Sequence, residues 1–172
     1  MVDPRTEGES LMLKRLEIRQ FKEDDLDQVI NINRKSLPEN YDRMFFVELY
    51  RRFPKLFMVA EVNGRVIGYA LCRMELGFPD LGSFGFLGKR GHIVSIAVLE
   101  EHRRMGIGTR LMKQVMKAMG EHGIGECYLE VRVSNKGAIQ MYEKLGFVTS
   151  KRAPGSVSYT HLTLPRIERC RS

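Results

Sequence analysis

One feature constrains the fold of this chain more than any other: an apolar strand leads through a glycine-containing turn into a helix. Residues 92–98, His-Ile-Val-Ser-Ile-Ala-Val, have the length and character of a strand covered on both faces of a sheet. Residues 108–120 carry apolar side chains at helical spacing, and residues 126–133 alternate as a second strand does. A helix that connects two such strands makes a right-handed parallel unit. The sequence therefore predicts an α/β fold.

The rest of the chain completes a mixed sheet. Asn63-Gly64 between two apolar runs indicates a β-hairpin, because both residues accept the positive φ angles of a tight turn. Pro38 and Pro54 each end a stretch with helical spacing, and the five glycines of residues 77–91 predict a loop. The predicted strands are residues 16–21, 56–62, 65–72, 92–98, 126–133 and a stretch from 147, and the predicted helices are 24–37, 42–53, 108–120 and 138–145.

Composition excludes several classes of protein. No apolar stretch approaches the roughly 18 residues that a membrane helix needs, and the polar N-terminus lacks the apolar core of a secretory signal. Cys72, Cys127 and Cys170 are widely spaced and form no Cys-x-x-Cys pair, which argues against a disulfide framework and a zinc knuckle. We expect a cytoplasmic protein whose 172 residues form one domain.

The net charge of +7 raises the question of a nucleic-acid partner. From Arg152 onward there are four Arg and one Glu, while acidic and basic residues are interspersed along the rest of the chain. This distribution gives no basic stripe of the kind that follows a phosphate backbone. Nucleic acid is therefore a disfavoured partner, and a basic patch that helps to capture an anionic cofactor is the more economical interpretation.

The turn before the long helix has the composition of an anion-binding site. Residues 103–109 have the sequence Arg-Arg-Met-Gly-Ile-Gly-Thr. A helix start leaves backbone N–H groups unpaired, and glycines let an anionic group touch the main chain, so a pyrophosphate is the implied ligand. The third glycine of a dinucleotide fold and the Gly-Lys-Ser/Thr of a P-loop are both missing. A plain turn with a solvated helix start stays open as the alternative.

Four segments in this order resemble the GNAT superfamily of acetyl-CoA-dependent N-acetyltransferases. More narrowly, they resemble the archaeal protein N-terminal acetyltransferases and the relatives that acetylate a ribosomal-protein alanine. The segments are residues 37–41 (Leu-Pro-Glu-Asn-Tyr), 91–98, 103–108 and 128–135 (Tyr-Leu-Glu-Val-Arg-Val-Ser-Asn), and the stretch 135–147 adds to the match. The resemblance implies the GNAT fold, an α/β fold whose mixed central sheet has splayed parallel strands and helices on both faces.

The resemblance implies acetyl-CoA as co-substrate and assigns residues to it. Main-chain groups of Ile96, Ala97 and Val98 would hold the pantetheine arm as if it were a further strand. The residues that would cradle the pyrophosphate are Arg103, Arg104, Met105, Gly106, Ile107, Gly108 and Thr109. Those that would line the same groove from elsewhere are Asn135, Tyr142 and Lys144.

Acetyl transfer needs a general base, because an α-amine with a pKa of about 8 is mostly charged at neutral pH. Glu130 matches the proton acceptor of the bacterial relatives, and His92 matches a residue that archaeal relatives use beside it. Tyr142 matches the general acid that meets the departing CoA thiolate. No residue matches a covalent acetyl carrier, so we expect direct attack in a ternary complex. Cys127 is predicted to be a small buried residue and not a nucleophile.

Each of these residues also has a purely structural interpretation. A glutamate on a strand ordinarily faces solvent, His92 can cap its strand, and Tyr142 can pack in the core. Leu37, Glu39 and Tyr41 match the peptide-binding loop of the family, where a glutamate is by default a solvated charge. The other histidines have no second ligand at metal spacing, and no metal is predicted.

The C-terminal segment departs from the family. Relatives end with a strand of paired tyrosines and an acidic Asp-Gly-Glu-Asp-Ala stretch, and residues 152–172 contain neither. We hypothesise a replaced, non-native terminus in which Val157, Tyr159 and Leu162 supply a makeshift strand. The expected organisation is a disordered leader over residues 1–15, the acetyltransferase domain over residues 16–151 and this atypical tail.

The sequence thus predicts an enzyme that acetylates the N-terminal α-amines of proteins, with nascent chains at the ribosome as candidate partners and no membrane partner. Two alternatives stay open. One is a lysine or small-amine acetyltransferase acting on substrates such as polyamines. The other is a non-catalytic acyl-CoA-binding protein, which an altered tail that destroys the peptide slot would favour.

Overall fold

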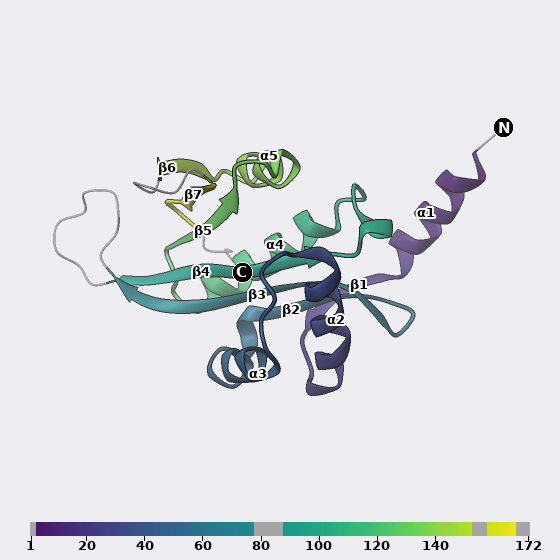
Figure 1. Cartoon of the computed structure of the whole chain (residues 1–172), viewed down its shortest axis with the longest axis horizontal. Coiled ribbons are helices and arrows are strands. Elements are labelled where there is room, and N and C mark those ends of the chain that lie inside the picture. Colours follow the sequence, from purple (N-terminus) through teal and green to yellow (C-terminus); the bar gives the residue numbers. More distant parts are fainter. Residues whose placement is uncertain (1–2, 78–87, 153–157, 168–172) are drawn as a thin grey trace. The chain divides into compact units, whose positions relative to one another are not determined.

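The computed structural model describes residues 3–77, 88–152 and 158–167, in which seven strands form one mixed sheet (Figure 1). The strands are β1 (Leu16–Gln20), β2 (Phe57–Val62), β3 (Arg65–Gly77), β4 (Gly88–Val98), β5 (Glu126–Arg132), β6 (Val148–Arg152) and β7 (Tyr159–Leu164). The helices are α1 (Pro4–Arg15), α2 (Leu26–Ser36), α3 (Arg43–Arg52), α4 (Ile107–Glu121) and α5 (Lys136–Lys144), with short 3-10 turns η1 (Glu23–Asp25), η2 (Pro54–Leu56) and η3 (Glu100–His102). The strand order is β1-β2-β3-β4-β5-β7-β6, and β4 runs parallel to β5. The predicted α/β class with a mixed sheet is confirmed.

The glycine-rich segment between β3 and β4 is shorter than the predicted loop. The prediction of a loop over residues 77–91 was wrong at its C-terminal end, because β4 begins at Gly88, and β3 runs five residues past its predicted end to Gly77. Residues 78–87 lie outside the described part of the chain. A Cβ on Gly91 would come within 2.7 Å of Met119 Sδ. This glycine therefore marks close packing inside a strand and not a turn.

Helix α1 lies in the stretch for which the sequence predicts a disordered leader. Asp3 caps its first turn by accepting a hydrogen bond from Arg5 N at 3.0 Å, and a proline stands at its first position. Lys14 and Arg15 lie in the last turn, where the helix dipole favours positive charge. No residue of α1 is buried, and Met12 and Leu13 are its half-buried residues.

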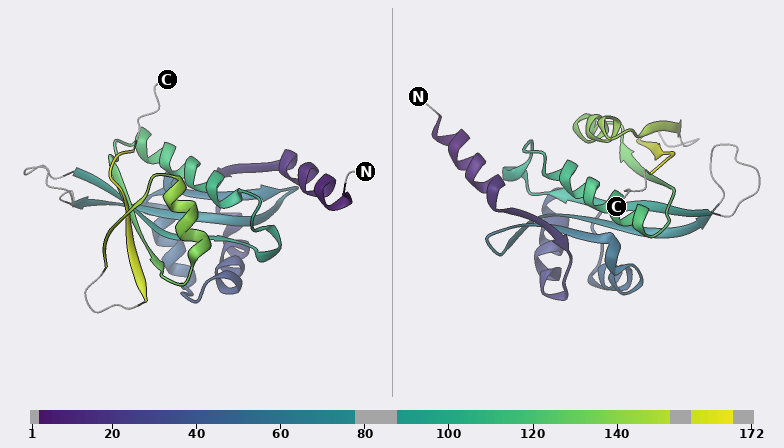
Figure 2. Two further views of the ribbon diagram at one scale, coloured as in Figure 1. Left: turned by 90° about the horizontal axis from the view of Figure 1, so that it is seen from above. Right: turned by 180° about the vertical axis from the view of Figure 1, so that it is seen from behind.

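By its contacts the chain divides into two compact units, the first made of Met1–Leu71 with Ser95–Gln114, the second of Cys72–Val94 with Val115–Ser172. In the first unit, α2 and α3 lie on one face of β1, β2 and the adjoining part of β3, and the first turns of α4 lie on the other face (Figure 2). The β2–β3 hairpin turns at Asn63 and Gly64, with φ angles of 50° and 82°. The hairpin predicted from this dipeptide is confirmed.

An aromatic cluster forms the core of the first unit. Phe21 stacks on Phe57 with ring centroids 4.0 Å apart, and Phe46 meets Tyr69 edge to face at 6.1 Å. Phe46, Phe57 and Tyr69 are wholly buried. Because aromatic side chains bury large apolar areas, this cluster ties α3 to β2 and β3.

A largely buried ion pair joins β1 to η1. Both terminal guanidinium nitrogens of Arg19 donate to Asp25, at 2.7 and 2.8 Å, and Arg19 Nε donates to Glu61 at 2.6 Å. Burial by itself would raise the pKa of Asp25, but the hydrogen bonds from Arg19 and from the Lys22 N–H outweigh it and hold the pKa below its usual value. Asp25 is therefore ionised at neutral pH.

Replacing Asp25 with asparagine is expected to lower the free energy of unfolding by about 2 kcal/mol at neutral pH, because Arg19 loses its charged partner. Since the folded-state pKa of Asp25 lies below the unfolded value of about 3.9, the pair stabilises the fold above that pH, and its contribution disappears as the pH falls through the folded-state pKa. Urea unfolding at neutral and strongly acidic pH measures both effects, with the exposed neighbour Asp24→Asn as control. A deficit of the same size in strong acid would contradict the assignment.

In the second unit, β7 lies between β5 and β6. The segment predicted to be atypical supplies this strand, and Leu162 and Thr163 on it are wholly buried. Val157 lies outside the described residues. That the tail is a non-native replacement stays a prediction, which sequencing of the source gene tests.

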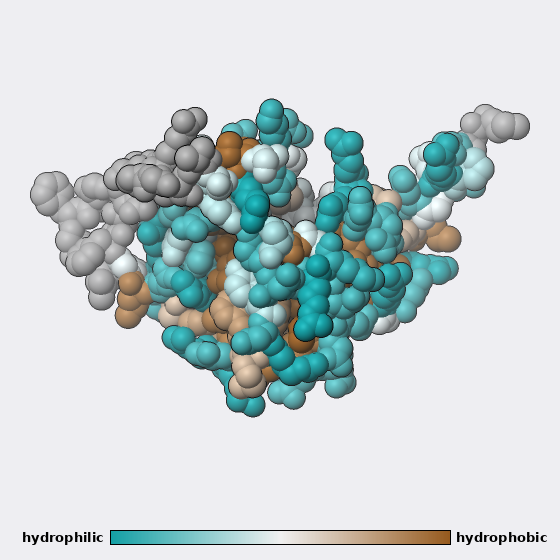
Figure 3. Space-filling view, in the orientation of Figure 1, coloured by the Kyte–Doolittle hydropathy of each residue, from teal (hydrophilic) through white to brown (hydrophobic). Residues whose placement is uncertain are grey.

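No helix within the described ranges combines the length and the apolar character needed to cross a bilayer. Polar and charged residues cover most of the face shown in Figure 3.

Candidate active site

Strand β4 carries the first group of predicted site residues. Its residues alternate between buried and half-buried positions, and His92, Ile96 and Val98 share the half-buried side. The ladder between β4 and β5 joins residues 90–92 to residues 126–128, and both strands extend beyond it. That the two parallel strands splay apart stays a prediction from the resemblance.

His92 lies in the second unit at the end of this ladder. Its ring stacks on Tyr128 with centroids 4.5 Å apart, and its Nδ1 is 3.7 Å from Glu75 Oε1. Among the described residues, this buried Nδ1 has no hydrogen-bond partner. Burial, helped by Arg73 and opposed by Glu75, lowers the pKa of His92 to about 4. The imidazole is therefore neutral at physiological pH and has a lone pair that can accept a proton.

The side chains that surround His92 were not predicted. The Tyr128 hydroxyl donates to Glu75 Oε2 at 2.7 Å, and Arg73 Nε donates to Glu75 Oε1 at 2.8 Å. Burial tends to raise the pKa of Glu75, but the Tyr128 hydrogen bond and the Arg73 charge outweigh it and lower the pKa. The available signal was the alternation of Arg73 and Glu75 with apolar residues, which extends β3 past its predicted end.

Glu130 is exposed on β5, two residues beyond Tyr128, so the two side chains project from the same side of the strand. In register it opposes His161 of β7. Its exposure agrees with the structural interpretation of a solvent-facing strand glutamate. The same exposure gives its carboxylate the access to water that proton removal through a solvent molecule requires.

Two further side chains of the second unit are buried. Tyr142 on α5 is 4% exposed, and its ring packs against Phe147 with centroids 5.6 Å apart. Burial raises the pKa of its hydroxyl above the ordinary range, so the group stays protonated and can donate. Cys127 is wholly buried, as predicted, and burial raises the pKa of its thiol to about 12. A thiol held in the protonated form is a poor nucleophile.

Residues 103–106 form the turn into α4, and residues 107–109 begin the helix, all in the first unit. Arg104 has a φ of 63°, a left-handed conformation that costs a non-glycine residue about 1–2 kcal/mol, and Gly106 has a φ of 77°. Left-handed residues in a turn direct successive N–H groups to one side and so form a concavity that binds anions. Arg103 Nε donates to Val98 O at 3.0 Å, and buried Ile107 anchors the first turn of the helix. Arg104 and Gly106 are exposed, so a ligand can reach the turn.

The remaining cofactor residues predicted in the second unit lie at the two ends of α5. Asn135 is the N-cap, and its Oδ1 accepts a hydrogen bond from Ala138 N at 3.2 Å. This capping role leaves the side-chain NH₂ as a donor. Lys144 is exposed in the last turn of the helix.

The predicted peptide-binding loop, residues 37–41, joins α2 to α3 in the first unit. Leu37, Glu39 and Tyr41 are all half-buried. The Tyr41 ring stacks on Phe45 with centroids 4.3 Å apart. The loop is thus packed against α3, and it lies in the same unit as β4 residues 96–98 and the turn into α4.

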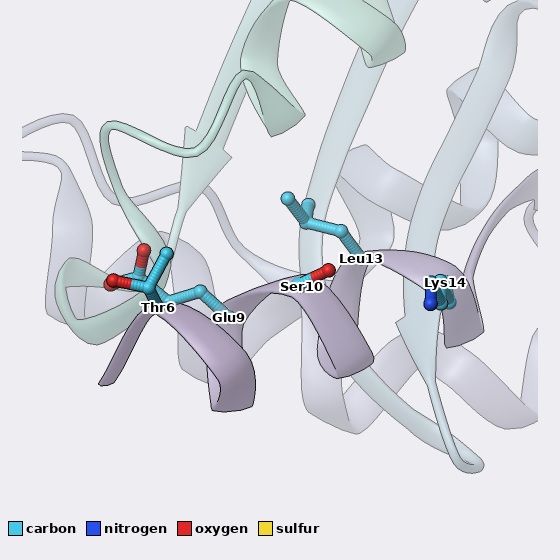
Figure 4. Close-up of a pocket in the computed structure, with 5 residues that line it drawn as sticks. All are labelled: Thr6, Glu9, Ser10, Leu13 and Lys14. Atoms are coloured by element: carbon cyan, nitrogen blue, oxygen red, sulfur yellow. The ribbon is translucent and has the colours of Figure 1, made fainter. Parts of the chain in front are cut away.

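A shallow pocket of about 400 Å³ lies elsewhere, on α1 (Figure 4). Its lining residues are Thr6, Glu9, Ser10, Leu13 and Lys14. Since no predicted site residue is among them, this pocket is not the candidate active site. Within the ranges that the structure describes, no group of three or more His, Cys, Asp or Glu side chains is arranged to hold a metal ion.

Known proteins resemble this chain over most of its length. A family model described as "Acetyltransferase (GNAT) family" matches residues 26–147. The N-alpha-acetyltransferase of Sulfurisphaera tokodaii is 53% identical over 135 residues, which cover 78% of this chain and 81% of that protein. The N-alpha-acetyltransferase of Saccharolobus solfataricus is 48% identical over 139 residues, which cover 80% and 83%.

Solved structures agree with these matches. Ard1 from Thermoplasma volcanium has a TM-score of 0.74 at 29% identity, over 90% of this chain and 99% of that one. Chaetomium thermophilum Naa20 in complex with a bisubstrate analogue has a TM-score of 0.72, also at 29% identity, over 87% and 86%. The family model and the two archaeal relatives show that the chain belongs to the GNAT family of acetyltransferases, and the left-handed turn into α4 agrees with this.

Proposed function

We propose that this acetyltransferase transfers the acetyl group of acetyl-CoA to the N-terminal α-amine of proteins by direct attack in a ternary complex. The observation that carries the proposal is the turn into α4, in which Arg104 and Gly106 are left-handed. They lie directly before the N-terminus of a helix, and such a turn is suited to bind a pyrophosphate. The relatives at 53% and 48% identity, each named N-alpha-acetyltransferase, support the choice of an α-amine.

The turn and β4 fit acetyl-CoA, which supplies an activated acetyl thioester when bound. The N–H groups of residues 104–109 would hold the pyrophosphate, and the side chains of Arg103 and Arg104 would offset its charge. Residues 96–98 would offer main-chain groups to the pantetheine arm in the manner of an added strand. Asn135 would donate from its side-chain NH₂, and Lys144 would add a positive charge.

Proton removal from the amine would fall to His92 and Glu130. An α-amine with a pKa of about 8 is mostly charged at neutral pH and cannot attack until it loses a proton. Glu130 is exposed to water and would take that proton directly or through a solvent molecule, while His92 is neutral and would relay it. As the new C–N bond forms and the C–S bond breaks, the protonated Tyr142 would donate to the departing sulfur.

Substrate recognition would fall to the loop of residues 37–41, with Leu37, Glu39 and Tyr41 meeting the first residues of the protein substrate. We place the reaction in the cytoplasm and include nascent chains at the ribosome among the substrates. A loop at the surface can bind the short, flexible N-termini of many proteins, which a deep cavity would not admit as readily.

Mass spectrometry of peptides incubated with acetyl-CoA tests the proposal. Two peptides differ only in the amine that they offer: the first has a free N-terminus and no lysine, and the second has a blocked N-terminus and one internal lysine. We expect acetylation of the first peptide only. Acetylation of the lysine peptide or of a polyamine alone would establish a lysine or small-amine acetyltransferase instead. Calorimetric binding of CoA without turnover on any amine would establish a non-catalytic acyl-CoA-binding protein.

A further inference from the structure

Three hydrogen-bonded polar side chains cross the core of the first unit. Asn33 of α2 donates from Nδ2 to the Tyr69 hydroxyl of β3 at 3.0 Å, and that hydroxyl lies 2.7 Å from Ser95 Oγ of β4. Asn33 and Tyr69 are wholly buried, and Ser95 is 5% exposed. Polar groups in an apolar interior are costly unless they are paired, so a satisfied chain of this kind selects one arrangement of its members.

The same asparagine holds the main chain of the loop at residues 37–41. Its Oδ1 accepts from Tyr41 N at 3.2 Å, and its Nδ2 also donates to Glu39 O at 3.1 Å. One buried side-chain amide therefore makes three hydrogen bonds, two of them to backbone groups of the loop. These bonds supply the partners that backbone groups need where a loop turns toward the interior.

Packing alone does not require an asparagine at this place. Asn33 continues the apolar stripe of α2 that includes the buried Val29 and Ile30, where an aliphatic side chain would fill the same space. An aliphatic residue would, however, leave Tyr41 N and Glu39 O without these partners. The polar residue thus serves the conformation of the loop more than the packing of the helix.

We propose that Asn33 is a positioning residue for the protein substrate. By binding the main chain at Glu39 and Tyr41, it holds residues 37–41 in the shape that receives the first residues of the substrate. Tyr69 and Ser95 in turn fix the orientation of the Asn33 amide. The inference rests on the proposed function, because it assigns the loop to the peptide. A loop held in its binding shape before the substrate arrives loses less conformational entropy on binding.

Steady-state kinetics of Asn33→Ala test the inference. We expect the KM for peptide to rise about tenfold, as loss of one or two hydrogen bonds predicts, and the kcat and the KM for acetyl-CoA to stay within about twofold. Val29→Ala is the matched control, since Val29 is wholly buried one turn earlier on the same helix. It should lower thermal stability without changing the KM for peptide. The inference would be overturned if Asn33→Ala raised the KM for peptide and the KM for acetyl-CoA equally. It would also be overturned if Val29→Ala raised the KM for peptide as much as Asn33→Ala does.

Hydrogen exchange at the Tyr41 amide supplies a readout that does not depend on activity. In the wild-type protein this N–H is bonded to Asn33 and should be protected. We expect its exchange to accelerate at least tenfold in Asn33→Ala and to stay unchanged in Val29→Ala. Unchanged exchange in Asn33→Ala would show that the loop does not depend on Asn33. A wild-type protein that acetylates no α-amine would instead defeat the proposed function, while exchange still decides the anchoring of the loop.

Tyr69→Phe is a second variant that tests the same inference if Asn33→Ala does not fold. It removes only the hydroxyl that orients the Asn33 amide and preserves the ring in the aromatic cluster. We expect a rise of about threefold in the KM for peptide, because the bonds from Asn33 to the loop are weakened and not removed. An unchanged KM for peptide in this variant, together with unchanged exchange at Tyr41, would contradict the proposed positioning role.

Discussion

Gly106→Val is expected to bind acetyl-CoA about a hundredfold more weakly than the wild-type protein while it keeps the same fold. Gly106 has a φ of 77° in the turn into α4, a conformation that a β-branched residue avoids. A valine there would shift the turn toward negative φ and turn its N–H groups away from the pyrophosphate. Loss of one charge-assisted hydrogen bond at the upper end of the range of about 1.5–3 kcal/mol accounts for the change, since about 1.4 kcal/mol is a factor of ten in affinity. Isothermal titration calorimetry with CoA measures it.

Gly64 provides the matched control for this variant. It too is left-handed, with a φ of 82°, and a Cβ on either glycine would meet nothing within 4 Å. Gly64→Val therefore imposes a similar backbone strain in a hairpin turn, and we expect it to lower thermal stability without changing the affinity for CoA. Equal weakening by both variants would show that strain, and not the anion-binding turn, is responsible. A wild-type protein without affinity for CoA would defeat the whole assignment.

The elements around the proposed cofactor site were predictable because their signals are local. The apolar stripe of α4, the turn dipeptide at Asn63 and Gly64, and the stop at Pro38 each depend on neighbours in sequence. The start of β4 was not predictable in this way. Its first residues include Gly88 and Gly91, and glycine has low strand propensity. Gly91 is held by its pairing with Cys127 and by close packing against Met119.

The candidate site shows the same division between local and tertiary signals. His92 could be picked out from its motif, but its low pKa depends on burial and on the charge of Arg73 of β3, which together outweigh the opposing effect of Glu75. Asn33 fitted the helical spacing of α2 and so was predicted only as part of that helix. Its role follows from Tyr69 and from a loop, and these contacts exist only in the folded chain. A spacing pattern shows which residues share a face and not what that face meets.

Glu130→Gln is expected to lower kcat for acetylation of a peptide α-amine about a hundredfold at neutral pH, within the range for loss of a general base. Glutamine keeps the size of the side chain but cannot take up the proton. We expect the KM for acetyl-CoA to stay unchanged, because the residues proposed to hold that co-substrate are not altered. Glu17→Gln is the matched control, since Glu17 is likewise an exposed strand glutamate, on β1. A loss of similar size in Glu17→Gln would remove the case for a specific role of Glu130.

The pH dependence of this deficit identifies what Glu130 does. Above the α-amine pKa of about 8 the substrate has already lost its proton, so the deficit of Glu130→Gln should shrink as the pH rises through that value. His92 contributes no limb to the profile near neutral pH, because its pKa of about 4 keeps it neutral there. A deficit that stays constant into alkaline solution would mean that Glu130 acts through its charge and not as a base. His92→Gln provides the comparison. If this variant loses more activity than Glu130→Gln at neutral pH and recovers it in alkaline solution, the amine proton passes to His92.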